Sequence, residues 1–267
     1  MISKLRTLFE LYKQKKFLNK IFFYKINNLL RLGSDYGGWN FFDHKNLYNS
    51  TIITAGLGED ASFDIEFINK YNAKVICIDP TPRAVDHYNQ IMKFKGKKKL
   101  LKYNDNGNQN INSYNLLKIN HKNFTLIDKA LYNCDDKILD FYPPPNTKHV
   151  SHSLNDWQNN YKRDSKSIKV KTITLEKIVK KNELKILPLL KLDIEGAENE
   201  VIENMIENKI FPDQICVEFD ELHILNENSM NKFLRTHEIL IKENYVPIKI
   251  NSKIQDMLYL NKKIIPS

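Results

Sequence analysis

The chain has 267 residues, of which 42% are hydrophobic and 27% are charged, with 8 glycines and 9 prolines. This composition excludes a disordered or fibrous protein and suits a single α/β domain with an addition at one end. Lysine and arginine outnumber the acids by 41 to 32. Because lysine is common here alongside asparagine and isoleucine, we read the excess as compositional drift and expect no nucleic-acid partner. A basic balance still suits an anionic substrate or a membrane surface.

The three cysteines, Cys77, Cys134 and Cys216, match no zinc-binding spacing. No apolar run reaches the length of about 18 residues that predicts a transmembrane helix. The N-terminal residues carry too many lysines for a signal peptide and show no small-residue cleavage site. We therefore expect a cytoplasmic protein, which could still associate with a membrane surface.

Residues 1–32 form a basic segment in which apolar side chains recur at helical spacing. We expect a helix whose apolar face packs on the main domain or on a second subunit, which would make a homodimer. An amphipathic helix that lies on a membrane surface is the alternative. Residues 33–267 are expected to form the main domain.

A glycine-containing loop follows at residues 33–39, where Tyr36 and Trp39 flank a pair of glycines. The loop could close over a ligand, with Trp39 as a wall of the site. It could equally be a turn between two packed rings. Under the first interpretation, Tyr36 and Trp39 are candidate substrate-binding residues.

From residue 50 the pattern alternates between strands and helices, as in a parallel sheet covered by helices on both faces. Strands are expected at 51–55, 74–79, 124–131, 189–193 and 214–220, with a closing hairpin at 246–250 and 256–260. An insert at about 139–172 interrupts this series, with two strands flanking a long polar loop. Loops of that length are usually functional or disordered. The insert is expected to lie on the substrate side, with His149, Ser151 and Ser153 as candidate site residues.

The first strand leads into Gly56 and Gly58, which let a ligand approach the backbone closely at the start of a helix. Asp79 ends the next strand, where an acid can take both hydroxyls of an adenosine ribose. Glu59 and Asp60 would repel the pyrophosphate of a dinucleotide but tolerate a sulfonium-bearing nucleoside. The loop therefore favours S-adenosylmethionine over a nicotinamide cofactor.

Asp128 ends the third expected strand. From this position its carboxylate could reach an adenine amino group. It could equally be a solvated acid at the end of a strand. We keep both interpretations and count Asp128 among the candidate cofactor-binding residues.

The stretch LLKLDIEGAE at 189–198 begins as a buried strand, ends in Asp193 and Glu195, and turns through Gly196 into a helix. Ligands of open α/β sheets bind outside the carboxyl ends of the strands. Acids there are costly to bury and are not needed for packing. We expect Asp193 or Glu195 to take a proton from a substrate hydroxyl, with His149 as the alternative base.

Glu218, Asp220 and His223 end the fifth strand, close to Asp193 if strands four and five are neighbours. Their oxygen and nitrogen atoms are ligands that a divalent metal accepts. The spacing is not that of a specific metal signature, and we favour a polar rim that binds substrate. A divalent metal is therefore possible here but not expected.

These motifs together resemble the FkbM family of S-adenosylmethionine-dependent methyltransferases. The most specific is LKLDIEGAE at 190–198, and supporting stretches are YGGW at 36–39, GLGEDASFD at 56–64, DPTP at 79–82, HVSHS at 149–153 and VEFD at 217–220. The resemblance covers about residues 33–260 in order. Thr54 departs from it, because many members carry an acid two residues before the first glycine. Glu59 or Asp60 could then hold the amino end of the cofactor.

The resemblance implies a class I methyltransferase sheet, with strand order 3-2-1-4-5-7-6 and the last strand antiparallel. It also implies roles for individual residues: Gly56 and Gly58 behind the methionine part of the cofactor, Asp79 at its ribose, Asp128 at its adenine, and Asp193 and Glu195 near the reacting centre. Members of the family commonly methylate hydroxyl groups of small secondary products or glycans. We therefore expect O-methylation of a small-molecule or glycan substrate, at a hydroxyl group of a sugar.

Two other classes of protein stay open. A nicotinamide-dependent oxidoreductase could use the same sheet. A non-catalytic protein of a membrane surface or an assembly could use the basic N-terminal segment. Binding of one cofactor and not the other would separate the enzymes, and liposome binding by a protein with no cofactor would favour the third class.

Overall fold

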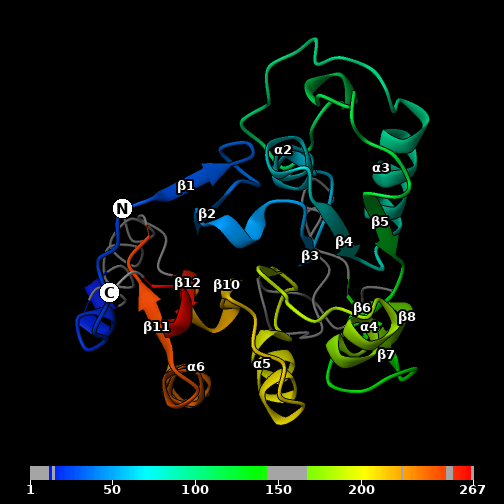
Figure 1. Cartoon of the computed structure of the whole chain (residues 1–267). Coiled ribbons are helices and arrows are strands. Elements are labelled where there is room, and N and C mark those ends of the chain that lie inside the picture. Colours follow the sequence, from blue (N-terminus) through cyan, green and yellow to red (C-terminus); the bar gives the residue numbers. More distant parts are fainter. Residues whose placement is uncertain (1–11, 14–15, 143–166, 224, 251–254, 266–267) are drawn as a thin grey trace, which may run out of the picture.

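The computed structural model describes residues 12–13, 16–142, 167–223, 225–250 and 255–265. Its centre is a seven-stranded mixed sheet between layers of helices (Figure 1). From one edge to the other the strands are β5 (Phe124–Ile127), β4 (Lys74–Ile78), β3 (Thr51–Ala55), β9 (Leu190–Leu192), β10 (Gln214–Glu218), β12 (Asp256–Asn261) and β11 (Tyr245–Ile248). Neighbours from β5 to β10 run parallel, whereas β12 is antiparallel to both β10 and β11. The mixed α/β fold and its strand order confirm the prediction.

Helices cover both faces of this sheet. One face carries α2 (Ser62–Tyr71) and α3 (Pro82–Lys93), and the other carries α4 (Leu175–Lys181), α5 (Glu198–Glu207) and α6 (Glu227–Lys242) (Figure 1). Successive side chains of a strand point to opposite faces, so β3 contributes to two cores. Ile52 packs with side chains of α2 and α3, and Ile53 packs with those of α4, α5 and α6. Burial on both faces explains why the strands read as continuous apolar runs.

The N-terminal segment packs on the main domain where the structure describes it. Residues 16–18 are helical, and Phe17 and Ile21 are buried. The Phe17 ring lies 5.8 Å from the ring of Phe233 in α6, in an edge-on arrangement. Residues 1–11 and 14–15 lie outside the described residues, so the predicted helix is supported only in part.

A helix over the whole of 1–32 was the wrong expectation at its carboxyl end. Leu29–Leu32 form a strand, β1, which pairs antiparallel with β2 (Trp39–Phe42). Asn28, just before β1, has a φ of 67°, a left-handed conformation that asparagine tolerates and that does not continue a helix. The loop at 33–39 is therefore the connection of a β-hairpin.

The strands that flank the predicted insert are present. They are β7 (Ile138–Phe141) and β8 (Ile168–Ile173), which pair antiparallel, and β8 also pairs with β6 (Ala130–Leu131). These strands make a small sheet beside α4 (Figure 1). The single strand expected at 124–131 is divided, because the chain leaves the main sheet after Ile127 and β6 joins the small one. Residues 143–166, with His149, Ser151 and Ser153, lie outside the described residues.

Short 3-10 helices connect several of these elements: η1 (Lys45–Leu47), η2 (Ile111–Ser113), η4 (Asp220–Leu222) and η5 (Lys262–Ile264). Of these, η4 follows β10 directly and carries part of the site described below. Among the helices of the described residues, none combines the length and the apolar character that crossing a membrane requires.

Candidate active site

The carboxyl ends of β3, β4, β9 and β10 meet at one edge of the sheet, because these strands are parallel neighbours. A cavity of about 330 Å³, here called the first cavity, opens at this edge. Its lining includes residues 56–60, 79–81 and 193–195, which follow β3, β4 and β9. It also includes Glu218, the last residue of β10, and His223 beyond it. The volume lies within the range of small-molecule sites, about 300–1,000 Å³. The predicted position of the site, beyond the strand ends, agrees with this geometry.

Gly56 brings two of these loops into contact. Its φ is 87°, in the left-handed region that favours glycine. A Cβ on Gly56 would lie 1.8 Å from the carbonyl oxygen of Asp193. No larger residue therefore fits between the ends of β3 and β9, and the backbone of the loop at 56–60 faces the cavity without side-chain cover at this point.

Asp79 holds this glycine loop in shape. One of its carboxylate oxygens accepts hydrogen bonds of 2.9 Å from the N–H groups of both Leu57 and Gly58. The other oxygen accepts from the N–H and the hydroxyl of Thr81. Asp79 lies in the lining of the first cavity, where an acid that binds ribose is expected. The contact with ribose itself stays a prediction, because these bonds give the carboxylate a structural role as well.

Glu59 and Asp60 also line the first cavity, but both already bind other parts of the chain. Glu59 forms an ion pair with Arg83 of α3. Asp60 is buried and accepts hydrogen bonds from the Ser34 hydroxyl and from the N–H of Ser62. These bonds fasten the β1–β2 hairpin to the start of α2. Contact of either acid with the amino end of a cofactor stays a prediction.

Thr54, the departure from the family pattern, has an acidic partner from another element. Its hydroxyl donates a 2.7 Å hydrogen bond to Asp64, which lies in the first turn of α2 and is buried. Enclosure in the protein raises the pKa of Asp64, while Lys191 and the bond from Thr54 oppose this. A carboxyl group is therefore present behind the glycine loop even though residue 54 is not an acid.

Lys191, in the middle of β9, is a site residue that the sequence did not single out. Its Nζ donates a 2.6 Å hydrogen bond to the carbonyl oxygen of Gly56 and lies 3.6 Å from Oδ2 of Asp193. Its side chain is only 6% exposed. Burial lowers the pKa of Lys191, but the charges of Asp193 and Asp64 outweigh burial and raise it overall. The available signal was a lysine between leucines in a buried strand, since buried lysines are almost always paired.

Asp193 lies beside this ammonium group and lines the cavity. Its side chain is 32% exposed. Enclosure raises its pKa to about 7, Lys191 opposes the rise, and the carboxylates of Glu218 and Asp220 add to it. A carboxyl group with this pKa can accept a proton near neutral pH, which is the property that a general base needs.

Glu195 follows Asp193 in a turn with unusual backbone geometry. Its φ is 57°, a left-handed conformation that non-glycine residues adopt at a cost, and Gly196 continues the turn with a φ of 107°. Glu198 stabilises this turn, because its buried carboxylate accepts hydrogen bonds from the N–H groups of Ile194 and Gly196. The turn brings Glu195 into the lining of the first cavity with Asp193, as the sequence predicts.

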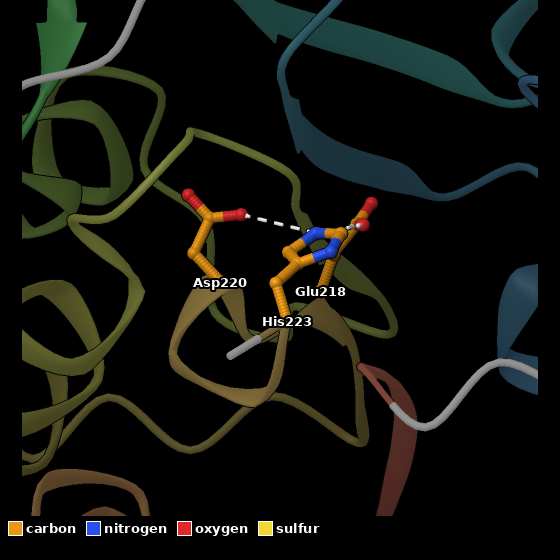
Figure 2. A group of neighbouring side chains, drawn as sticks. All are labelled: Glu218, Asp220 and His223. Carbon is orange, nitrogen blue, oxygen red and sulfur yellow. Dashed lines mark ion pairs between the residues drawn. The ribbon is translucent and has the colours of Figure 1, made fainter. Parts of the chain in front are cut away.

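Glu218, Asp220 and His223 form a second group of candidate site residues, here called the carboxylate–imidazole group. Nε2 of His223 lies 3.3 Å from Oε1 of Glu218 and 3.6 Å from Oδ1 of Asp220. Figure 2 shows the imidazole between the two carboxylates, with all of these side chains at the end of β10. The hydrogen bond to Glu218 raises the pKa of His223 although burial opposes it. The expected proximity of this group to Asp193 is borne out, since Glu218 and His223 line the same cavity.

A second cavity, of about 360 Å³, adjoins the first. The two share Tyr36, Asp193 and Glu218 in their linings. Trp39 lines the second cavity only, and its ring lies 5.5 Å from Nζ of Lys191. Trp39 is buried at the start of β2, whereas Tyr36 is half exposed. Trp39 is thus a packed ring that also lines the second cavity, and Tyr36 lines both cavities. Closure of the loop over a ligand stays a prediction.

Asp128 occupies a different place from the one that the sequence suggested. It is exposed, in the connection between β5 and β6, and does not belong to the described lining of either cavity. Ala130 and Leu131 of β6 line the first cavity instead. These apolar residues offer a surface to a flat ring, and the contact of Asp128 with adenine stays a prediction.

A protein-family model described as a methyltransferase FkbM domain matches residues 31–247 of the chain. The matched range includes the glycine loop, Lys191, Asp193 and the carboxylate–imidazole group. No curated protein and no solved structure gives a significant match.

Proposed function

Because the chain belongs to the FkbM family of methyltransferases, we propose that it methylates a hydroxyl group of a sugar or glycan precursor and uses S-adenosylmethionine as the donor. Membership of a methyltransferase family argues against the alternative of a nicotinamide-dependent oxidoreductase. The observation that carries the proposal is the place of Asp193, which lines both cavities at the point where they adjoin. A donor in one cavity and an acceptor in the other would both reach this carboxyl group.

The first cavity has features that fit this donor. The backbone around Gly56 leaves no room for a Cβ, and Asp79 lies where ribose hydroxyls are expected. Ile78, Leu131 and Phe141 give the same cavity an apolar wall suited to an adenine ring. When bound, S-adenosylmethionine supplies a methyl group that the positive sulfonium already activates. The residues of the chain then have to hold the acceptor oxygen in line and exclude water.

A hydroxyl group is a poor nucleophile unless a base removes its proton. Asp193 is the proposed base, because its raised pKa of about 7 suits proton transfer at neutral pH. Lys191 fixes the position of this carboxyl group from 3.6 Å away. Glu195 is proposed to orient the acceptor from the neighbouring turn. His149 stays the alternative base, and it lies outside the described residues.

The second cavity is the proposed acceptor site. Its polar residues include Arg31, Asp35, Asn40 and Asp256. An acceptor that offers several hydroxyl groups can bond to such side chains through both donors and acceptors. A sugar or a glycan precursor has this chemistry. Ser151 and Ser153 of the insert are proposed as additional acceptor contacts.

The N-terminal segment carries two separate proposals, a homodimer contact and contact with a membrane surface. The buried Phe17 and Ile21 use part of its apolar face within the chain, while Tyr12 and Phe22 are exposed. Light scattering would detect a dimer. Sedimentation with anionic liposomes would detect membrane contact, and a protein that stays monomeric and in the supernatant would remove both proposals.

The function is tested with a donor that carries a deuterated methyl group. Calorimetry should show binding of S-adenosylmethionine, and mass spectrometry should show transfer of the labelled methyl to one of a panel of sugar and glycan precursors. Asp193→Asn should bind the donor but lose most turnover, whereas Asp105→Asn, at an exposed carboxylate, should behave as wild type. Absence of donor binding would remove the proposal. Full turnover by Asp193→Asn would remove the base assignment alone.

A further inference from the structure

We propose that Glu218, Asp220 and His223 bind a divalent transition-metal cation, which holds the acceptor hydroxyl beside Asp193. The site for the cation follows from the positions of these side chains alone. The use of the cation in catalysis rests on the proposed function. The sequence predicts that these residues form a polar rim that binds the substrate. In the present proposal they bind the substrate through a cation.

The distances between the donor atoms suit one metal ion. One ligand atom from each residue lies within 4.8 Å of the other two. Ligands at about 2.1 Å from a metal, separated by about 90–120°, are about 3.0–3.6 Å apart. The separations from Nε2 of His223 to the carboxylate oxygens of Glu218 and Asp220, 3.3 Å and 3.6 Å, lie within this range. Figure 2 shows that the imidazole ring lies between the two carboxylates, with Nε2 close to both of them.

The chemistry of the donors indicates the class of metal. Two carboxylates and one neutral imidazole would neutralise the charge of a divalent cation. An imidazole nitrogen among the ligands favours transition metals such as Mn²⁺ or Zn²⁺ over Mg²⁺ and Ca²⁺, which prefer oxygen. Three protein ligands leave coordination positions open for a substrate, as in catalytic metal sites.

The surroundings of the group add support from other elements of the fold. Asp193 lies at the end of the neighbouring strand, β9, and Asp256 begins β12 on the other side of β10. Both Asp193 and Asp256 line the second cavity together with Glu218. Carboxylates at the ends of three adjacent strands thus line the second cavity, and their negative charge attracts a cation to it.

A cation at this boundary would change the chemistry of the acceptor. An oxygen bound to a metal loses its proton much more readily than a free one. The acceptor O–H bond would break with its proton passing to Asp193. The oxygen would form a bond to the methyl carbon while the bond from sulfur to that carbon breaks, and the electron pair would stay on sulfur.

Metal binding is tested first on the wild-type chain, without turnover. Protein freed of metal by a chelator is titrated with MnCl₂ while electron paramagnetic resonance measures free Mn²⁺. We expect one saturable site and, in pulsed spectra of the bound ion, coupling to a histidine nitrogen. Absence of a saturable site, or a bound ion with no nitrogen coupling, would overturn the proposal whatever the variants do.

Variants then assign the ligands. Glu218→Gln and His223→Gln change side chains that are partly exposed, so circular dichroism should show an intact fold. Each should weaken Mn²⁺ binding by at least about tenfold, since even outer-shell partners of a metal usually matter that much. His121→Gln, at an exposed histidine far along the chain, is the matched control and should bind as wild type. Wild-type affinity in both ligand variants would overturn the assignment.

Two further measurements separate this inference from the proposed function. Donor binding is measured by calorimetry with and without Mn²⁺, and methyl transfer is measured in chelator. Full methyl transfer in the presence of chelator would support the proposed function and overturn the proposed role of the cation in catalysis. If the protein binds Mn²⁺ tightly but does not bind S-adenosylmethionine, the proposal of a cation site stands and the proposed function is overturned.

Discussion

Asp193→Asn should make the folded protein more stable at alkaline pH while it removes activity. The folded state raises the pKa of Asp193 from its ordinary value of 3.8 to about 7. Between these two pH values the folded chain keeps a proton that the unfolded chain has lost. Stability of the wild type therefore falls as pH rises through this window, and the whole loss is present above pH 7. Because asparagine does not ionise, the stability of the Asp193→Asn protein does not fall in this way.

The size of the effect follows from the same shift. A rise of about three pKa units corresponds to an upper bound of about 4 kcal/mol. The side chain is 32% exposed, so solvent screens part of this energy and a realistic value is ~1–2 kcal/mol. For a chain of this size, such a change moves the unfolding temperature by about 2–8 °C.

The assay is thermal unfolding followed by circular dichroism at pH 5 and pH 8, in chelator so that no cation contributes. The difference in unfolding temperature between Asp193→Asn and wild type should grow from the acidic to the alkaline condition. Asp105→Asn, at an exposed carboxylate, should show no such growth. A pH-independent difference, or a less stable Asp193→Asn protein at pH 8, would refute the reasoning.

Substitutions at three further positions test the surroundings of the base. Gly56→Ala should abolish donor binding measured by calorimetry and lower the unfolding temperature, because its Cβ would lie 1.8 Å from a backbone oxygen. Lys191→Met removes the cation that lowers the pKa of Asp193, so the rising limb of kcat/KM against pH should move above its wild-type position. It should also cost about 1–3 kcal/mol in urea unfolding, because the carbonyl oxygen of Gly56 loses the hydrogen bond from Lys191. Glu198→Ala should cost about 1–3 kcal/mol in the same assay, because the part-buried N–H of Ile194 and the buried N–H of Gly196 lose their acceptor. Glu198→Gln keeps an acceptor oxygen and should cost less; equal losses for the two changes would contradict this role.

The sequence predicted those parts of the site that depend on single strands and the turns after them. Asp193 and Glu195 follow an apolar run and precede a helical pattern, so their place at a strand end could be read locally. Glycines beyond β3 and the acid beyond β4 are equally local signals. Parallel neighbours end at the same edge of a sheet, which is why these separate signals converge on one cavity.

Features that depend on distant contacts were not predictable in this way. Lys191 reads as part of an apolar run, and its partner Gly56 lies 135 positions away. Asp128 was placed at a strand end, but the chain leaves β5 one residue earlier and joins the small sheet. Leu29–Leu32 have an apolar pattern that suits a helix, yet pairing with β2 makes them a strand. In each case tertiary pairing overrides the local pattern.

The contacts of Lys191 have a consequence for the order of events during a reaction cycle. This ammonium group bonds to the loop that would carry the donor and lies beside the carboxyl group that would take the proton. A positively charged donor in the first cavity would lower the pKa of Asp193 further, because opposite charges favour the ionised form. Asp193 would then be ionised, and able to accept a proton, to the greatest extent while the methyl donor is bound. After the methyl transfer the thioether product carries no charge on sulfur. Once this product leaves, the pKa of Asp193 would return to the value that it has in the free protein.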